Sequence, residues 1–402
     1  MRLLVVMRYY PCPPRIGSSI VAYNNIKEMS KEHSIYFMCV DVPKDEGEFA
    51  EFVERIEFVT VKNISWIAQL VRSAFYMLLG VPRFISACAS QTMQARVREV
   101  VEQNTFDGIL LYDMDAIQYF QPTCYKQMIV NIEDPQSIKL HRMYRLPNLS
   151  PWEKVKLFVD ARVLARYEKR YLPQMAKVVV LSEEDAKDLR EEGRYDNIGC
   201  VSYGVNRRSM EEILRCEERT DGMIIFSGSM FHLPNVDGAV YFVRHIFEFV
   251  LKEYPTATLW IVGAEPDSRI RNATVAFGER VVITGRVNDM SDYLRRAKVS
   301  ICPVRLKIGV QTKILEALSW GTPVVTTSAG NSGVDGFSGK DLWVEDNPST
   351  FAKRVVQLLR GENWNRLSEG GRELVHKRFS WERGSAELEQ HIMTIHGGGS
   401  QR

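Results

Sequence analysis

The stretch KVSICPVRLKIGVQTKILEALSWGTPVVTT, residues 298–327, reads as a strand, a turn, a helix and a second strand. Val299 and Ile301 suit a short buried strand, and Pro303 near its end cannot donate a ladder hydrogen bond. Gly309 then allows the backbone to turn tightly. The pattern predicts a buried strand whose loop leads directly into a helix.

Basic residues surround this turn, and no acid interrupts Arg305, Lys307 and Lys313. The helix expected from near Val310 points unpaired N–H groups and its positive dipole end into the same space, which favours an anionic ligand. Lys313 can take phosphate charge, and Glu316 can accept hydrogen bonds from both ribose hydroxyls. The residues therefore suggest a nucleotide site; the alternative is an amphipathic helix with a solvated Lys–Glu pair.

The helix that carries these residues has a clear core face and a clear end. Ile314, Leu315 and Leu318 recur at three- and four-residue spacing, as an amphipathic helix requires. Gly321 and Pro323 follow where a helix is expected to stop.

Residues 316–325, EALSWGTPVV, resemble the "EAhxxGxPVV" phrase in the nucleotide-sugar motif of retaining GT-B glycosyltransferases of family 4. The family also has a Glu eight positions before this one, where the chain has Ile308. A bacterial subgroup associated with exopolysaccharide synthesis reads similarly, with a basic residue, a Gly and a Gln-x-Lys before the Glu. With Ile308 in its place, the chain lacks the side chain through which the family's first Glu contacts the donor sugar.

Length and composition fit a globular protein with two full cores. The chain has 402 residues, of which 45% are hydrophobic and 25% charged. Its net charge of +2 argues against a general nucleic-acid binder, so no nucleic-acid partner is expected.

The seven Cys form no CxxC pair, which favours reduced thiols in a cytosolic protein over a zinc site or a disulfide framework. The apolar run before Arg8 is too short for a signal peptide. Residues 64–82 are apolar but contain Arg72, and are not expected to span a bilayer.

The N-terminal half alternates apolar strands with helical segments. Strands are expected at LLVVM (3–7), FDGILLY (106–112), QMIVNI (127–132) and KVVVL (177–181). Polar residues follow the last three of them. An open parallel sheet binds its ligand beyond the carboxyl ends of its strands. The expected fold is therefore α/β, and the resemblance implies GT-B, with two Rossmann-like doubly wound domains facing a central cleft.

Two polar groups are candidates for the acceptor or sugar side of the site. Glu133 and Asp134 follow the strand 127–132, and helix capping is the alternative reading. Gly17, Ser18 and Ser19 begin the first expected helix, where Ser18 or Ser19 can serve as the N-cap. The resemblance implies that this turn faces the donor phosphates and the acceptor.

Asp113 and Asp115 form a DxD after an apolar strand, which is how metal-dependent transferases of the GT-A fold hold a divalent ion. Two acids at this spacing also occur in ordinary charged loops. The basic residues around Lys313 already supply the charge that a metal would provide, so no metal is expected.

Residues 140–177 are rich in Arg and Lys, with Trp152 and Phe158 interleaved, and Trp66 and Phe75 add aromatic rings from an earlier segment. Such a surface can contact an anionic membrane peripherally. The alternative is a solvated helix face with core aromatics.

A second strand–helix series begins at Met223 and contains expected strands at 223–226, 258–263 and 281–285, as in another doubly wound domain. It resembles the family's donor domain nearly end to end. The resemblance implies base contacts by Arg286 and Val287. The other residues expected to bind the donor are Gly228, Ser229, Gly309, Val310, Gln311 and Thr312.

The expected domain plan follows the family's ending as well. It comprises an acceptor-binding domain at 1–205, a polar linker at 206–221, a nucleotide-sugar-binding domain at 222–380, a helix at 381–396 that crosses back to the first domain, and a disordered tail at 397–402.

These observations predict a retaining, metal-independent glycosyltransferase that uses no cofactor. It would move a sugar from a nucleotide diphosphate-sugar, with UDP or GDP as the nucleotide, to a glycan, glycolipid or small-molecule acceptor. Arg305 and Lys313 would stabilise the leaving diphosphate and Glu316 would hold the ribose. The expected location is the cytoplasm, including the inner face of the cell membrane. The alternatives are a non-catalytic nucleotide-sugar-binding subunit and a GT-B sugar-nucleotide epimerase.

Overall fold

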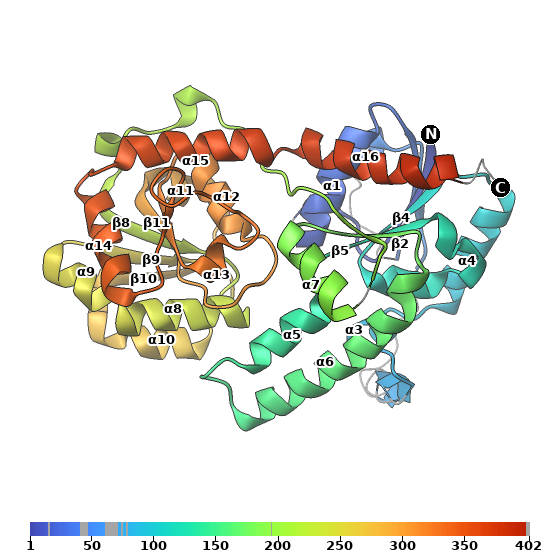
Figure 1. Cartoon of the computed structure of the whole chain (residues 1–402), viewed down its shortest axis with the longest axis horizontal. Coiled ribbons are helices and arrows are strands. Elements are labelled where there is room, and N and C mark those ends of the chain that lie inside the picture. The colour runs from blue at the N-terminus through green and yellow to red at the C-terminus, as the bar shows by residue number, and fades with distance from the viewer. Residues whose placement is uncertain are drawn as a thin grey trace. The chain divides into compact units, whose positions relative to one another are not determined.

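The computed structural model describes residues 1–14, 17–40, 47–60, 71–73, 75–77, 79–193 and 195–398. Trp66 and the last four residues of the expected disordered tail lie outside this part of the chain. The chain forms two compact units (Figure 1). The first comprises Met1–Tyr144, Leu149–Gly204 and Trp381–Arg402, and the second comprises Arg145–Asn148 and Val205–Ser380.

A seven-stranded sheet in the order β3-β2-β1-β4-β5-β6-β7 forms the centre of the first unit, and every pairing is parallel. The strands are β1 (Arg2–Met7), β2 (Ser34–Cys39), β3 (Arg55–Phe58), β4 (Gly108–Tyr112), β5 (Met128–Glu133), β6 (Lys177–Val180) and β7 (Ile198–Cys200). In the register, Val5 pairs with Phe37 on one side and Leu110 on the other. The central strands are continuous apolar runs because both faces of a parallel sheet are buried.

The helices of the first unit that the structure describes are α1 (Gly17–Met29), α3 (Arg83–Ala87), α4 (Gln91–Gln103), α5 (Gln136–Tyr144), α6 (Pro151–Tyr171), α7 (Glu183–Gly193) and α16 (Trp381–Gly398). Since α1 already begins at Gly17, Ser18 and Ser19 lie inside its first turn, and the prediction that one of them is the N-cap was wrong. The final helix, α16, packs on α1 within this unit.

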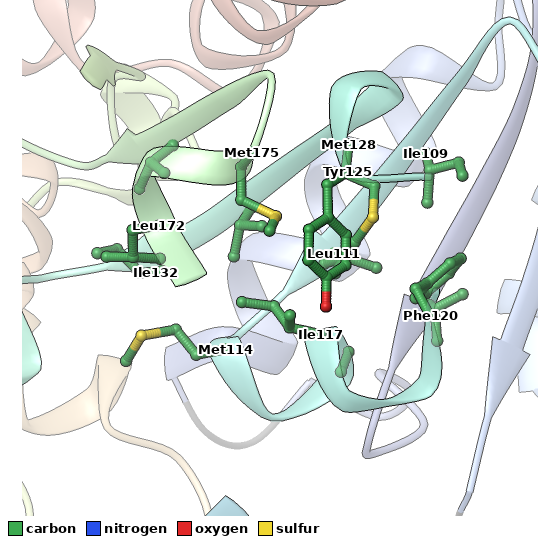
Figure 2. Packing of buried hydrophobic residues seen from close by; sticks show 14 of the residues in the cluster. Ile109, Leu111, Met114, Ile117, Phe120, Tyr125, Met128, Ile132, Leu172 and Met175 are labelled. Carbon is green, nitrogen blue, oxygen red and sulfur yellow. The ribbon is translucent and has the colours of Figure 1, made fainter. Parts of the chain in front are cut away.

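The core of the first unit continues past the carboxyl ends of β4 and β5. Figure 2 shows Leu111, Ile117 and Tyr125 gathered together, and all three are buried. Met114 and Ile132 extend the same cluster. This packing fixes the backbone that directly follows the two strands.

The second unit contains a six-stranded parallel sheet in the order β10-β9-β8-β11-β12-β13. Its strands are β8 (Thr220–Ser227), β9 (Thr258–Val262), β10 (Val281–Gly285), β11 (Ala297–Cys302), β12 (Val324–Thr326) and β13 (Trp343–Val344). The expectation of two doubly wound parallel sheets is confirmed.

The helices of the second unit are α8 (Leu233–His245), α9 (Phe247–Glu253), α10 (Ser268–Thr274), α11 (Ser291–Arg296), α12 (Thr312–Ser319), α13 (Ser328–Asn331), α14 (Pro348–Leu359) and α15 (Trp364–Arg378). The apolar spacing of Val240, Val243, Ile246 and Val250 predicts one helix. The structure has two helices here, because Ile246 leaves the helical region at φ −124°. Phe242 and Phe247 on either side of the break are both buried, with ring centroids 5.9 Å apart.

A buried guanidinium joins the ends of two helices in the second unit. Arg219, only 4% exposed, donates to the carbonyl oxygens of Trp320 (2.8 Å), Ala297 (2.9 Å) and Leu294 (3.3 Å), and to the Thr322 hydroxyl (2.7 Å). These carbonyls lie at the C-terminal ends of α11 and α12, where a cation is favoured. Burial lowers the pKa of Arg219 to about 10, so the group is still charged at neutral pH.

We expect Arg219→Met to destabilise the protein by roughly 3–5 kcal/mol, the range for removing one member of a buried charged network. The carbonyls of Trp320 and Ala297 would lose this donor, whereas that of Leu294 would keep the Thr322 hydroxyl (2.7 Å). Urea unfolding measures the loss, with Arg296→Met, an exposed residue on α11, as the matched control. Equal midpoints for the two variants would contradict this role.

Candidate functional site

The strand order of the second sheet reverses between β8 and β11, and this is where an open parallel sheet binds ligands. The segments 227–229 and 303–305 leave the carboxyl ends of these two strands. Helices α8 and α12 follow them, so the N-terminal turns of both helices lie at the same edge (Figure 1).

Glycines let the backbone turns at this edge approach each other closely. Gly228 and Gly263 have φ of 139° and 154°, and their amides donate to the carbonyls of Val262 (3.0 Å) and Gly285 (3.1 Å). A Cβ on Gly263 would lie 1.7 Å from the carbonyl oxygen of Gly228. A Cβ on Gly228 would lie 3.1 Å from Cε of Lys313, so glycine is needed at both positions.

The ammonium group of Lys313 is held by two uncharged side chains. Its Nζ donates to Oδ1 of Asn235 on α8 (3.0 Å) and to Oε1 of Gln311 (2.9 Å). Because neither partner carries a charge, the positive charge of Lys313 is not neutralised by its hydrogen bonds. Lys313 is half-buried, which reduces screening by water.

The N-terminus of α12 lies beside this ammonium group and has no side-chain cap. The helix begins at Thr312, two residues later than predicted, after the tight turn at Gly309 (φ 52°). Gln311, at the cap position, instead donates to the carbonyl of Ile308 (2.9 Å).

Two amides of the first turn already have acceptors, because Thr312 donates to the carbonyl of Val310 (3.0 Å) and Ile314 to that of Gln311 (2.9 Å). The backbone amide of Lys313 is left for an anion.

Glu316 lies one turn further along α12 and is half-buried. Burial raises the pKa of its carboxyl group, while the nearby charges of Lys313 and Arg208 act in the opposite direction. The guanidinium of Arg208 lies 4.2 Å from the ring centroid of Trp320, and its Nε is buried without a hydrogen-bond partner. Sequence reasoning assigned Arg208 to the linker and missed its proximity to Glu316, for which no motif gives a signal.

Arg305 differs from Lys313 because its charge is balanced within the protein. Its guanidinium donates two hydrogen bonds to buried Asp237 (2.6 and 2.9 Å) and lies 4.6 Å from the ring centroid of Tyr241. The sequence predicted that Arg305 and Lys313 would both act on the diphosphate. The structure instead pairs Arg305 with Asp237 on α8.

The remaining residues expected to bind the donor are spread along the same edge. Ser229 is exposed after β8, and Val310 is half-buried in the turn before α12. Arg286 is exposed and Val287 half-buried directly after β10, which is separated from β11 by the two strands β9 and β8.

A second polar cluster lies in the first unit, at the carboxyl ends of β4 and β5. Asp113 and Glu133, which follow and end these strands, have φ of 72° and 59°, values that non-glycine residues rarely adopt. Oε2 of Glu133 lies 3.3 Å from where a Cβ on Gly17 would be, and Ser18 hydrogen-bonds to Asp113. The structure thus brings the predicted residues Gly17, Ser18 and Glu133 together, whereas Ser19 is buried within the first turn of α1.

Asp134, the other acid predicted here, makes different contacts. It forms an ion pair with Lys139 (2.9 Å) and accepts a hydrogen bond from Gln136 (2.9 Å), both on α5. The sequence had grouped Asp134 with Glu133, but the neighbour of Glu133 is Asp113.

Asp113 and Glu133 both bind protons more strongly than ordinary acids. Burial raises the pKa of Asp113 to about 7, and repulsion from Asp115 and Asp134 adds to the effect. Burial, followed by the charge of Asp113, raises the pKa of Glu133 well above its usual value.

Asp113 and Asp115, the two acids of the DxD, follow β4. Asp115 accepts a hydrogen bond from Cys88 (3.6 Å), and no three His, Cys, Asp or Glu residues in the part of the chain that the structure describes are grouped as metal ligands.

The family model of glycosyl transferases group 1 matches residues 221–361, which include Lys313, Glu316 and the glycine turns. Solved structures match the whole chain. Sucrose-phosphate synthase from Thermosynechococcus elongatus is 14% identical and superposes with a TM-score of 0.72, covering 99% of this chain and all of that one. The fold is GT-B.

Two further proteins are similar to the chain over most of its length. The structure of HepE from Anabaena in complex with UDP and glucose is 11% identical with a TM-score of 0.61, over 98% of this chain and all of that one. A Klebsiella pneumoniae protein described as an uncharacterized 44.6 kDa protein in the cps region is 19% identical, over 94% of this chain and 95% of its own length.

Proposed function

We propose that this GT-B protein is a glycosyltransferase that moves a sugar from a nucleotide diphosphate-sugar to a hydroxyl of an acceptor. The observation that carries the proposal is the uncompensated charge of Lys313 beside the uncapped N-terminus of α12. The match of residues 221–361 to group 1 glycosyl transferases supports it, as does the binding of UDP and glucose by HepE.

In this proposal the ammonium group and the backbone amide of Lys313, at the N-terminus of α12, bind the diphosphate and stabilise the negative charge that develops as it leaves. Ionised Glu316 accepts hydrogen bonds from the ribose hydroxyls, and the charge of Arg208 favours that ionised form. The glycine turn at Gly228 gives the phosphates close access to the backbone. Arg286 and Val287 contact the base.

We further propose that transfer retains the anomeric configuration and uses no metal. The resemblance to family 4 supports retention, because in retaining relatives the departing phosphate is thought to accept the acceptor's proton on the same face. Lys313 and the helix N-terminus supply positive charge where a metal ion would otherwise be needed. UDP or GDP is the proposed nucleotide, and polysaccharide or glycoconjugate synthesis in the cytoplasm is the proposed setting.

We expect Lys313→Met to lower the transfer rate about 10² to 10³-fold, the usual effect of removing one preorganised charge donor. Release of nucleotide diphosphate from UDP- and GDP-sugars with a panel of glycan acceptors measures it. Lys353→Met, at an exposed position on α14, is the matched control.

Full activity of Lys313→Met would refute the assignment. Binding of a nucleotide-sugar by the wild type without turnover on any acceptor would point to a non-catalytic subunit, and conversion of the donor without an acceptor would point to an epimerase.

A surface of the first unit supports peripheral contact with an anionic membrane. Of 13 large apolar side chains that are exposed in the described part of the chain, eight lie in two segments that flank one cavity. They are Val71, Phe75, Leu79, Phe84, Trp152, Val155, Phe158 and Val159. None of the described helices has the length and apolar character needed to span a bilayer.

The cavity has a volume of about 300 Å³. It is lined by Met77, Pro82, Arg83 and Phe84, by Lys156, Asp160, Val163 and Leu164, and by Gln136 and Leu140 of α5. Arg83 and Lys156 place positive charge at it, and Asp160 is the one acid in its lining. Apolar side chains beside basic ones match the surface of an anionic bilayer.

We expect the protein to co-sediment with vesicles of phosphatidylcholine and phosphatidylglycerol, and the double variant Trp152→Ser/Val155→Ser to bind them more weakly. Interfacial binding scales with the apolar area that enters the membrane. Phe249→Ser, at an exposed position of the second unit, controls for loss of an exposed ring. Unchanged sedimentation of the double variant would contradict the membrane contact.

A further inference from the structure

Three side chains of α12 form a stripe along one face of the helix. Lys313, Glu316 and Trp320 are spaced by three and four residues, which places them on the same side of a helix. Trp320 is the C-cap, and its amide donates to the carbonyl of Glu316 (3.3 Å). The stripe therefore leads from the N-terminus of α12, past Glu316, to the end of the helix.

Arg208 covers the Trp320 end of this stripe. Its guanidinium carbon lies 4.2 Å from the centroid of the Trp320 ring, which is a cation–π contact. Arg208 belongs to the same compact unit as α12. The contact holds the guanidinium one helical turn beyond Glu316, close enough for its charge to act on that carboxyl group.

The hydrogen-bond donors of Arg208 have no acceptor within the part of the chain that the structure describes. Its Nε is buried and has no hydrogen-bond partner. Its charge also acts on two other acids, but Asp289 accepts from the amide of Ser291 (2.8 Å) and Glu212 from that of Ser209 (2.8 Å). A buried donor without an acceptor costs free energy, which an acceptor atom of a ligand would recover.

The order of the groups along α12 matches the order of the groups in a nucleotide. In the proposed function the diphosphate binds at Lys313 and the ribose at Glu316. The two hydroxyls of the ribose lie on the opposite side of the sugar from its 5′ phosphates. Because Arg208 lies beyond Glu316, at the end of the stripe away from Lys313, it is next to the hydroxyls rather than the phosphates.

We infer that Arg208 binds the ribose of the nucleotide, and that it donates hydrogen bonds to the oxygen atoms of the 2′ and 3′ hydroxyls whose protons Glu316 accepts. The inference rests on the proposed function. It adds a side chain that lies outside residues 221–361, the part of the chain that the family model matches.

A pair of neighbouring hydroxyls needs both kinds of contact when it leaves water. Each hydroxyl has one proton to donate and lone pairs that accept. The ionised carboxylate of Glu316 can only accept, so it leaves the hydroxyl oxygens without donors. A guanidinium can only donate, and it presents its N–H groups in a rigid plane. Arg208 and Glu316 together therefore satisfy a ribose that neither side chain satisfies alone.

Calorimetric titration of the full chain with UDP and GDP, and with the 2′-deoxy form of each, measures the preference for ribose. We expect the wild type to bind at least one of the two nucleotides, and to bind its 2′-deoxy form more weakly. Arg208→Gln should reduce this preference roughly tenfold, because a charged donor to the hydroxyls is lost. Arg207→Gln, at the exposed neighbouring position, is the matched control and should keep the wild-type preference.

Pyrophosphate, which has no ribose, tests whether Arg208 acts on the phosphates instead. We expect the wild type, Arg208→Gln and Arg207→Gln to bind pyrophosphate equally well. Thermal unfolding of each variant shows whether it is folded. A loss of pyrophosphate binding by Arg208→Gln as large as its loss of nucleotide binding would overturn the ribose contact.

A further pair of variants separates a direct contact from an effect through Glu316. If Arg208 only kept Glu316 ionised, its removal would change nothing once Glu316 is replaced by Gln. We expect Arg208→Gln/Glu316→Gln to prefer ribose less than Glu316→Gln does. An equal preference in these two variants, or an unchanged preference in Arg208→Gln, would overturn the role of Arg208. Failure of the wild type to bind either nucleotide would overturn the proposed function itself, so the two failures are distinguishable.

Discussion

The ammonium group of Lys313 is held in place by two amide oxygens, and this choice of neutral partners determines what the second unit can bind. Asn235 and Gln311 fix the position of the charge without cancelling it. The neighbouring Arg305 shows the opposite arrangement, since buried Asp237 balances it through two hydrogen bonds. In the proposed function, the diphosphate therefore binds at Lys313, whose charge is not balanced, and not at Arg305, whose charge is balanced by Asp237.

Backbone turns without side chains lie close to Lys313. Gly228 and Gly263 approach so closely that no side chain fits between them, and the Lys313 side chain lies against Gly228. The parallel order of the strands brings these turns and the start of α12 to one edge of the sheet. Buried Arg219 holds the other end of α12 through the carbonyl of Trp320. The helix is thus anchored at its C-terminus, which leaves its N-terminus free for a ligand.

In each unit a charged side chain lies beside a helix N-terminus, and the two side chains have opposite charges. In each, a strand at the point where the sheet order reverses leads into a helix whose N-terminus lies at the carboxyl edge. At α12 the side chain placed beside the helix is a cation, and at α1 it is the acid Glu133.

Local patterns predicted most of the fold, because apolar runs and helical periodicity report burial directly. The stretch 298–327 predicted β11, the turn at Gly309, α12 and β12 to within two or three residues. The sequence missed the break at Ile246, where packing of two phenylalanines overrides helical periodicity.

Pairings between distant residues were beyond the reach of sequence patterns. Arg305 and Asp237 lie 68 positions apart, and Glu133 meets Gly17 and Asp113 only through the order of the strands. Arg208 carries no motif and gains its role from a position near Glu316. The roles of Lys313 and Glu316 stay predictions from the sequence, whereas the charge balance around Arg305 required the structure.

A crystal structure of the protein with UDP tests the central claim most directly. The account predicts the diphosphate within hydrogen-bonding distance of Nζ and of the backbone amide of Lys313, with the ribose hydroxyls on Glu316. UDP bound elsewhere, with Lys313 still held only by Asn235 and Gln311, would contradict it.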